Sequence, residues 1–65
     1  MLKADKDSPR KDHNDRDLWE VVLSDGWAWN GKVKVYYYAY DSRSAVEYAQ
    51  REHRMPWKSV VKVTD

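Results

Sequence analysis

Aromatic and basic side chains suited to binding are concentrated in the middle of this 65-residue chain. The stretch KVKVYYYAY contains six of them: Lys32, Lys34, Tyr36, Tyr37, Tyr38 and Tyr40. Trp27 and Trp29 lie shortly before it. Tyrosine and tryptophan combine an apolar ring with a polar group and are enriched where proteins bind partners, and lysine adds positive charge. The chemistry that this stretch offers is therefore recognition of another macromolecule.

No combination of residues in the chain is typical of a catalytic or metal site. His13 and His53 are far apart in the sequence, there is no Cys, and the carboxylates are scattered. A zinc site needs several such ligands at short spacing, and a nucleophile needs an adjacent base. We therefore expect a protein that is not an enzyme and that uses no cofactor or metal. His53 is expected at the end of a helix, where positive charge is favoured.

Length and composition limit the possible classes further. A chain of 65 residues is near the lower size limit for a self-sufficient core, and its four Trp and five Tyr supply such a core efficiently. The formal charge of +1 argues against a general nucleic-acid binder. No apolar run approaches the roughly 18 residues of a membrane span, and the N-terminus lacks the apolar stretch of a signal peptide. We expect a monomeric, cytoplasmic protein without a membrane partner.

The first part of the chain is a mixed-charge stretch, MLKADKDSPRKDHNDRD. It has too little apolar surface to offset the entropy lost on ordering. We expect a disordered polar tail over residues 1–17 and a single domain over 18–65. An arm that becomes ordered on binding is the alternative.

Two stretches alternate with the period of a β-strand. They are LWEVVLSD, from residue 18, and KVKVYYYAY, from residue 32. The residues expected to face the core are Trp19, Val21, Leu23, Val33, Val35, Tyr37 and Ala39. Tyr36, Tyr38 and Tyr40 would then point to the opposite face, together with Lys32 and Lys34.

The connection SDGWAWNGK contains two turn sequences, DG and NG. With the hairpin turn at NG, one extra residue at DG brings the core residues of the two strands opposite one another. We therefore predict a long hairpin with a bulge at DG, in which Leu23 pairs with Tyr37 and Val21 pairs with Ala39. A single wide loop over 24–31 is the alternative.

A helix and a third strand follow. DSRSAVEYAQREH predicts a helix over 42–53, capped by Asp41 or Ser42 and ended by the Met-Pro pair after it. Its small residues Ala45 and Ala49 would let it lie close to a sheet. WKSVVKVTD predicts the last strand, in which Trp57, Ser59, Val61 and Val63 alternate with Lys58, Val60, Lys62 and Thr64.

These elements predict an α+β fold of the β-β-α-β type: a three-stranded antiparallel sheet with its first strand in the middle and one helix on one face. Lys58 and Lys62 are expected along a sheet edge, with Lys62 pointing away from the helix. Such lysines either protect an edge from pairing with another chain or contact a partner.

The sheet face away from the helix has no predicted element to cover it. The side chains expected on this face are Trp27, Trp29, Lys32, Lys34, Tyr36, Tyr38 and Tyr40. They either stabilise the sheet through cross-strand aromatic pairs or dock on a partner.

From Leu18 onward, the chain resembles the small RNA-polymerase inhibitor family of T7-like phages. The likeness covers residues 18–64 and is carried by LW in the first strand, by YA and AVEYA around the start of the helix, and by VVKV in the last strand. The resemblance implies a strand–strand–helix–strand fold. It also implies host takeover, in which a phage protein inhibits transcription by binding bacterial RNA polymerase in the host cytoplasm.

The family's last strand ends with two basic residues, two positions apart, that bind the polymerase. Lys62 matches the first, whereas Thr64 stands at the second, so Lys62 alone is carried over as a binding residue. The hairpin here is longer, and the family is acidic where this chain is near neutral.

Two other functions fit the residues. One is a different small phage or mobile-element modulator, such as an inhibitor of a host defence nuclease. The other is weak binding of single-stranded nucleic acid, with bases stacked on Trp27, Trp29 and Tyr36. The near-neutral charge makes nucleic acid the less favoured partner.

Overall fold

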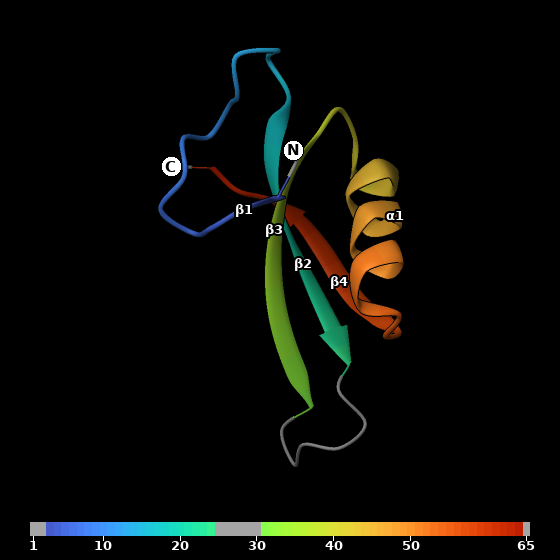
Figure 1. Ribbon diagram of the computed structural model, residues 1–65. Coiled ribbons are helices and arrows are strands. Elements are labelled where there is room, and N and C mark those ends of the chain that lie inside the picture. The colour runs from blue at the N-terminus through green and yellow to red at the C-terminus, as the bar shows by residue number, and fades with distance from the viewer. Residues whose placement is uncertain (1–2, 25–30, 65) are drawn as a thin grey trace.

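An antiparallel sheet with one helix on one face forms the fold (Figure 1). The computed structural model describes residues 3–24 and 31–64. Its elements are β1 (Lys3–Ala4), β2 (Asp17–Ser24), β3 (Lys32–Ala39), α1 (Ser42–His53) and β4 (Trp57–Lys62). The strand order β1-β3-β2-β4 confirms the α+β class and the central place of the first predicted strand, and β1 adds a fourth strand to the three predicted.

The core lies between α1 and the sheet face that the alternation predicts to be buried. Tyr37 is 1% exposed, and its ring centroid lies 6.3 Å from that of Tyr48 on the helix. Trp19 packs beside this core and donates its indole N–H to the carbonyl oxygen of Ala39 at 2.9 Å. The buried cluster comprises Val21, Leu23, Val35, Tyr37, Ala39, Ala45 and Ala49. The two helix alanines allow the close approach that the sequence predicts.

The helix forms over the predicted range, with Asp41 as its N-cap. The Asp41 carboxylate accepts the backbone N–H of Ser44 at 2.8 Å, and this hydrogen bond holds the pKa of Asp41 below its usual value. Arg54 ends the helix in the left-handed conformation, at φ 52°. Gln50 fixes the exit by donating its side-chain N–H to the Met55 carbonyl oxygen at 2.6 Å.

The pairing of β2 with β3 differs from the predicted register. Leu23 lies opposite Val33 and Val21 lies opposite Val35, each four positions from the predicted partner. Because α1 begins at Ser42, soon after β3, the predicted register would leave the first half of β2 without a partner in β3. The observed register pairs both strands over their full length, which fits the wide-connection alternative. Since the shift is even, every side chain keeps its predicted face. The predicted DG bulge falls outside the described residues.

Strand β4 presents to the core the side chains that were expected to face away from the helix. Val60 lies opposite Val21 and packs on the core, whereas Val61 is 51% exposed. Lys62 lies opposite Trp19 and therefore shares the sheet face on which α1 packs. The prediction that Lys62 points away from the helix is wrong. Valines occupy both alternating sets of this strand, so the local pattern does not decide between them.

A bulge in the β2–β4 pairing accounts for the position of the tryptophan of β4. The register shifts between Val22 and Leu23, so that Trp57 comes opposite Leu23 while Ser59 lies opposite Val22. Lys58 is the extra residue at this bulge. Trp57 thereby joins Val60 on the side of the helix, although the two are three positions apart and would lie on opposite faces of a regular strand.

The segment before β2 belongs to the fold, where the composition predicts a disordered tail. Lys3 lies opposite Tyr37, and its Nζ is 3.5 Å from Oε1 of Glu52 on α1. The N–H of Leu18 donates to the Arg10 carbonyl oxygen at 2.9 Å. In Figure 1 the segment between β1 and β2 lies on the side of the sheet away from α1, and Leu18, which faces that side, is fully buried. Local hydrogen bonds from aspartate and serine side chains order this polar segment, and composition does not reveal them.

Replacing Tyr37 by Ala should lower the free energy of unfolding by about 3–5 kcal/mol, as expected for a large buried aromatic side chain. Tyr36→Ala should cost no more than about 1 kcal/mol, because this half-buried residue lies on the opposite face. Tyr37→Phe should change the free energy of unfolding by no more than about 1–2 kcal/mol, because the buried hydroxyl has no partner in good hydrogen-bond geometry among the described residues. Burial, together with the interaction of this hydroxyl with the Glu52 carboxylate, raises the pKa of Tyr37. Chemical denaturation of the three variants provides the measurement, and equal losses for the two Ala variants would contradict this assignment of faces.

Candidate protein-binding surface

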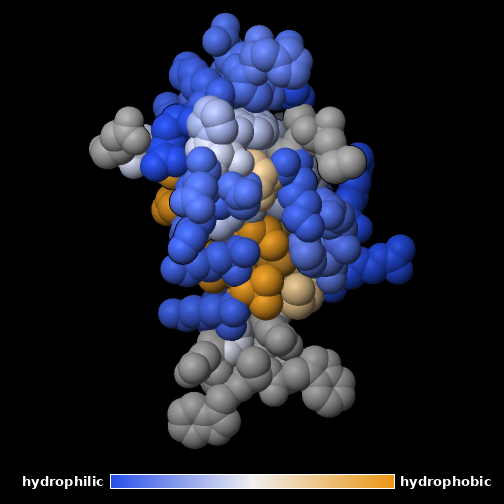
Figure 2. Space-filling model, turned by 60° about the vertical axis from the view of Figure 1, so that its left-hand side comes forward, coloured by the Kyte–Doolittle hydropathy of each residue, from blue (hydrophilic) through white to orange (hydrophobic). Residues whose placement is uncertain are grey.

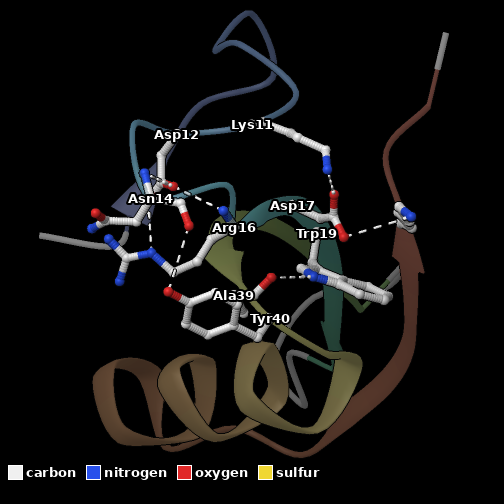
Figure 3. Close-up of polar contacts among 9 residues, drawn as sticks. Lys11, Asp12, Asn14, Arg16, Asp17, Trp19, Ala39 and Tyr40 are labelled. Carbon is white, nitrogen blue, oxygen red and sulfur yellow. Dashed lines mark hydrogen bonds and ion pairs between the residues drawn. The ribbon is translucent and has the colours of Figure 1, made fainter.

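An ion-pair cluster surrounds Lys62 at the end of β4. Asp17, at the start of β2, forms ion pairs with two lysines. Lys11 Nζ lies 3.6 Å from one carboxylate oxygen, and Lys62 Nζ lies 3.5 Å from the other (Figure 3). The Lys62 side chain is 52% exposed, whereas that of Asp17 is 20% exposed. Two lysines share one carboxylate, so the group keeps a net positive charge. An exposed pair of this kind is worth about 0–1 kcal/mol, so a carboxylate on a partner can replace Asp17 at little cost.

A hydrogen-bonded turn immediately precedes β2. The Oδ1 atom of Asp12 accepts the backbone N–H groups of Asn14 and Arg16, each at 2.9 Å, and Oδ2 accepts the Arg16 side-chain Nε–H at 2.7 Å (Figure 3). Desolvation alone would raise the pKa of Asp12, but the hydrogen bonds from Arg16 and Asn14 outweigh it and hold this pKa below its usual value. The Arg16 guanidinium also lies 5.9 Å from the ring centroid of Tyr40. The turn thus connects the N-terminal segment to the end of β3.

The sheet face away from α1 carries the predicted aromatic side chains. Of the predicted binding residues, Lys34, Tyr36 and Tyr38 lie on this face, and Tyr40 follows directly after β3. Figure 2 views the molecule from this side and shows an apolar patch bounded by hydrophilic side chains. The Tyr36 hydroxyl donates to Oε2 of Glu20 at 2.8 Å, and this hydrogen bond raises the pKa of Tyr36 above its usual value. Tyr40 is 69% exposed, but the Arg16 guanidinium lies over its ring. Two of the three tyrosines therefore already have partners within the chain.

The predicted binding residues fall on two separate surfaces. Lys58 and Lys62 belong to β4 at one edge of the sheet, and the tyrosines and Lys34 belong to the other face. Trp27 and Trp29 lie outside the described residues. The sequence did not identify Asp17 or Lys11 as neighbours of Lys62, because no local pattern links three charged residues in such distant segments.

Within residues 3–24 and 31–64, no cluster of three or more His, Cys, Asp or Glu side chains is arranged to hold a metal ion. In the same ranges, no helix has both the length and the apolar character needed to cross a membrane.

Comparison with protein-family models, with curated proteins and with solved structures finds no match to this chain. Its function must therefore be inferred from the geometry and charge of the two surfaces described above.

Acid should release the turn before β2 by protonating Asp12. The pKa of this carboxyl is lower in the folded chain than its usual 3.8, so its contribution to stability is fully present above 3.8 and is lost as the pH falls through the folded value. The amide resonances of Asn14 and Arg16 should therefore shift in an NMR titration with a midpoint below 3.8. Asp12→Ala should abolish this titration, and a midpoint at or above 3.8 in the unmodified protein would contradict the assignment.

Proposed function

We propose that this protein is a non-enzymatic binding module that attaches to bacterial RNA polymerase and inhibits transcription. The strand–strand–helix–strand arrangement of β2, β3, α1 and β4 agrees with the order of elements that the resemblance to the phage inhibitor family implies. A phage origin and action in the host cytoplasm belong to the same proposal. The partner is contacted by protein–protein binding at β4.

The observation that carries the proposal is the state of Lys62. It is half exposed on a strand at the edge of the sheet, and the carboxylate that it contacts within the described residues, that of Asp17, is shared with Lys11. Because Lys62 is half exposed, the free protein holds no buried unpaired charge at this position. In a complex, the same ammonium group can pair with a carboxylate of the partner. Lys62 is also the residue that matches the family's polymerase-binding base, so geometry and resemblance support the same position.

The aromatic face is the weaker candidate for the same role. The hydroxyl of Tyr36 is bound to Glu20, and the ring of Tyr40 lies beside Arg16. A ligand on this face would have to displace these partners, and the Glu20 carboxylate would repel the phosphates of a nucleic acid. For these reasons we place the binding surface at β4.

Lys62→Ala should weaken binding to purified bacterial RNA polymerase by at least about tenfold. Truncating one member of a charge pair that is desolvated at an interface costs roughly 2–5 kcal/mol, and tenfold corresponds to about 1.4 kcal/mol. The fold should be unaffected, since an exposed ion pair such as that with Asp17 contributes only about 0–1 kcal/mol. Titration of each variant against the polymerase, with transcription as a second readout, measures the effect.

Lys32→Ala is the matched control, because it removes the same charge from an exposed position on β3. Its affinity should equal that of the unmodified protein. Thr64→Arg, which restores the second basic position of the family, should leave affinity unchanged or raise it. Failure of the unmodified protein to bind polymerase would overturn the choice of partner. Binding that tolerates Lys62→Ala but is lost with Tyr36→Ala would move the site to the aromatic face.

A further inference from the structure

A groove runs between α1 and β4, beside the free edge of the sheet. Its volume is about 370 Å³, and it is lined by Ser42, Arg43, Val46, Glu47, Trp57 and Val60. The size is near the lower end of the roughly 300–1,000 Å³ typical of ligand sites, which is room for one large side chain. Trp57, which forms part of the groove wall, is 50% exposed, which is a high value for so large an aromatic side chain.

The backbone of β4 beside this groove can accept another strand. Within the described sheet, β4 pairs only with β2, so its outer edge is unpaired. The N–H of Val63 donates to the Leu18 carbonyl oxygen at 2.9 Å, so residue 63 turns its backbone groups inward, toward β2. Because these directions alternate along an antiparallel strand, Val61 also points inward while Val60 and Lys62 direct their N–H and C=O groups outward. The side chains of Val60 and Lys62 lie on the helix side of the sheet, and Val60 lines the groove.

The charges along this edge favour an acidic partner. Strand β4, with the sequence WKSVVK, carries Lys58 and Lys62 and no carboxylate. On the helix side of the groove, Arg43 and Glu47 form an ion pair with each other at 3.6 Å and so cancel. The edge as a whole is therefore positive.

The same lysines disfavour a second copy of this chain as the occupant. In an antiparallel pairing of two β4 strands, Lys58 and Lys62 of each copy would come close to the same lysines of the other. Like charges directly opposite on neighbouring strands are destabilising, and lysines on edge strands are a common protection against such pairing.

We propose that the edge of β4 and the α1–β4 groove bind an extended acidic segment of another protein as an added strand. A carboxylate of this segment meets Lys62, and an apolar side chain two positions away enters the groove against Val46 and Trp57, while further acidic residues are attracted by the charge of Lys58 at the bulge. Backbone hydrogen bonds to Val60 and Lys62 provide affinity, and the groove and the lysines provide specificity. This deepens the proposed function, because it rests on β4 as the binding surface, but it does not depend on polymerase as the partner.

The first test selects short peptides from a random display library on the unmodified protein. We expect enrichment of peptides in which an acidic residue lies two positions from an apolar residue. Synthetic copies of the selected peptides should bind Trp57→Ala and Val46→Glu roughly tenfold or more weakly, as for the central anchor of an interface. Tyr40→Ala, an exposed aromatic change away from the groove, is the control and should bind normally. Failure to enrich acidic peptides, or equal binding by the groove variants and the unmodified protein, would overturn the proposal.

The second test uses amide hydrogen exchange with the best selected peptide. The amides of Val60 and Lys62 should exchange rapidly in the free protein and slow when the peptide binds. The amide of Val61 is the internal control, because it faces β2 and should be protected in both states. Unchanged exchange at Val60 and Lys62 in the peptide complex would rule out an added strand.

A polymerase titration of the Trp57→Ala variant separates this inference from the proposed function. Peptide binding without polymerase binding would overturn the choice of partner and leave the groove in place. Polymerase binding that tolerates Trp57→Ala, together with no selected peptides, would retain the partner and overturn the groove.

Discussion

The central position of β2, paired along its length with β3 and along most of it with β4, is the constraint on which the rest of the structure depends. It creates rows of side chains that cross the sheet beneath the helix. One row runs through Val35, Val21 and Val60, and Val21 at its centre is fully buried. A neighbouring row runs through Tyr37, Trp19 and Lys62, so it passes from the centre of the core to the edge within three residues. The last position of such a row lies at the edge of the sheet, where the charged end of a long side chain such as that of Lys62 can reach water.

This arrangement explains why Lys62 is both part of the fold and available for binding. Its backbone is fixed by β4, its side chain lies on the helix side, and its ammonium group reaches Asp17 at the start of β2. Lys11 balances the same carboxylate from the N-terminal segment. The charge at this corner is thus positioned by two strands and one irregular segment, and it depends on all of them.

The N-terminal segment also compensates for the small size of the core. β1 extends the sheet beyond β3, and Lys3 links that edge to α1 through Glu52. On the other face, the segment lies on the same side of the sheet as Leu18, a fully buried apolar residue that faces away from the helix. The same segment leaves the outer edge of β4 unpaired, so the fold has one edge that β1 occupies in part and one edge that remains open along β4.

The sequence by itself determined the two long strands, the helix and the last strand, and it also determined the faces of the two long strands. Alternation in LWEVVLSD and KVKVYYYAY separated Tyr37 from Tyr36, and an even error in register could not change that separation. The helix range followed from Asp41 and the spacing of Ala45 and Ala49, because capping and helical periodicity are local properties. Lys62 could be singled out only through the family resemblance and its place in the last strand.

Tertiary structure decided the features that depend on residues distant in sequence. The register of β2 against β3 follows from the start of α1, and the face of β4 follows from its bulged pairing with β2, since valines at 60 and 61 satisfy either choice locally. The order in residues 3–17 rests on particular hydrogen bonds, such as those to Asp12. The average charge and average hydropathy of the segment do not reveal these bonds. The ion pairs around Asp17 and the groove at Trp57 are also decided by tertiary structure, because their residues come together only when the sheet and the helix have assembled. A local sequence pattern carries no information about contacts between residues that are distant in the sequence.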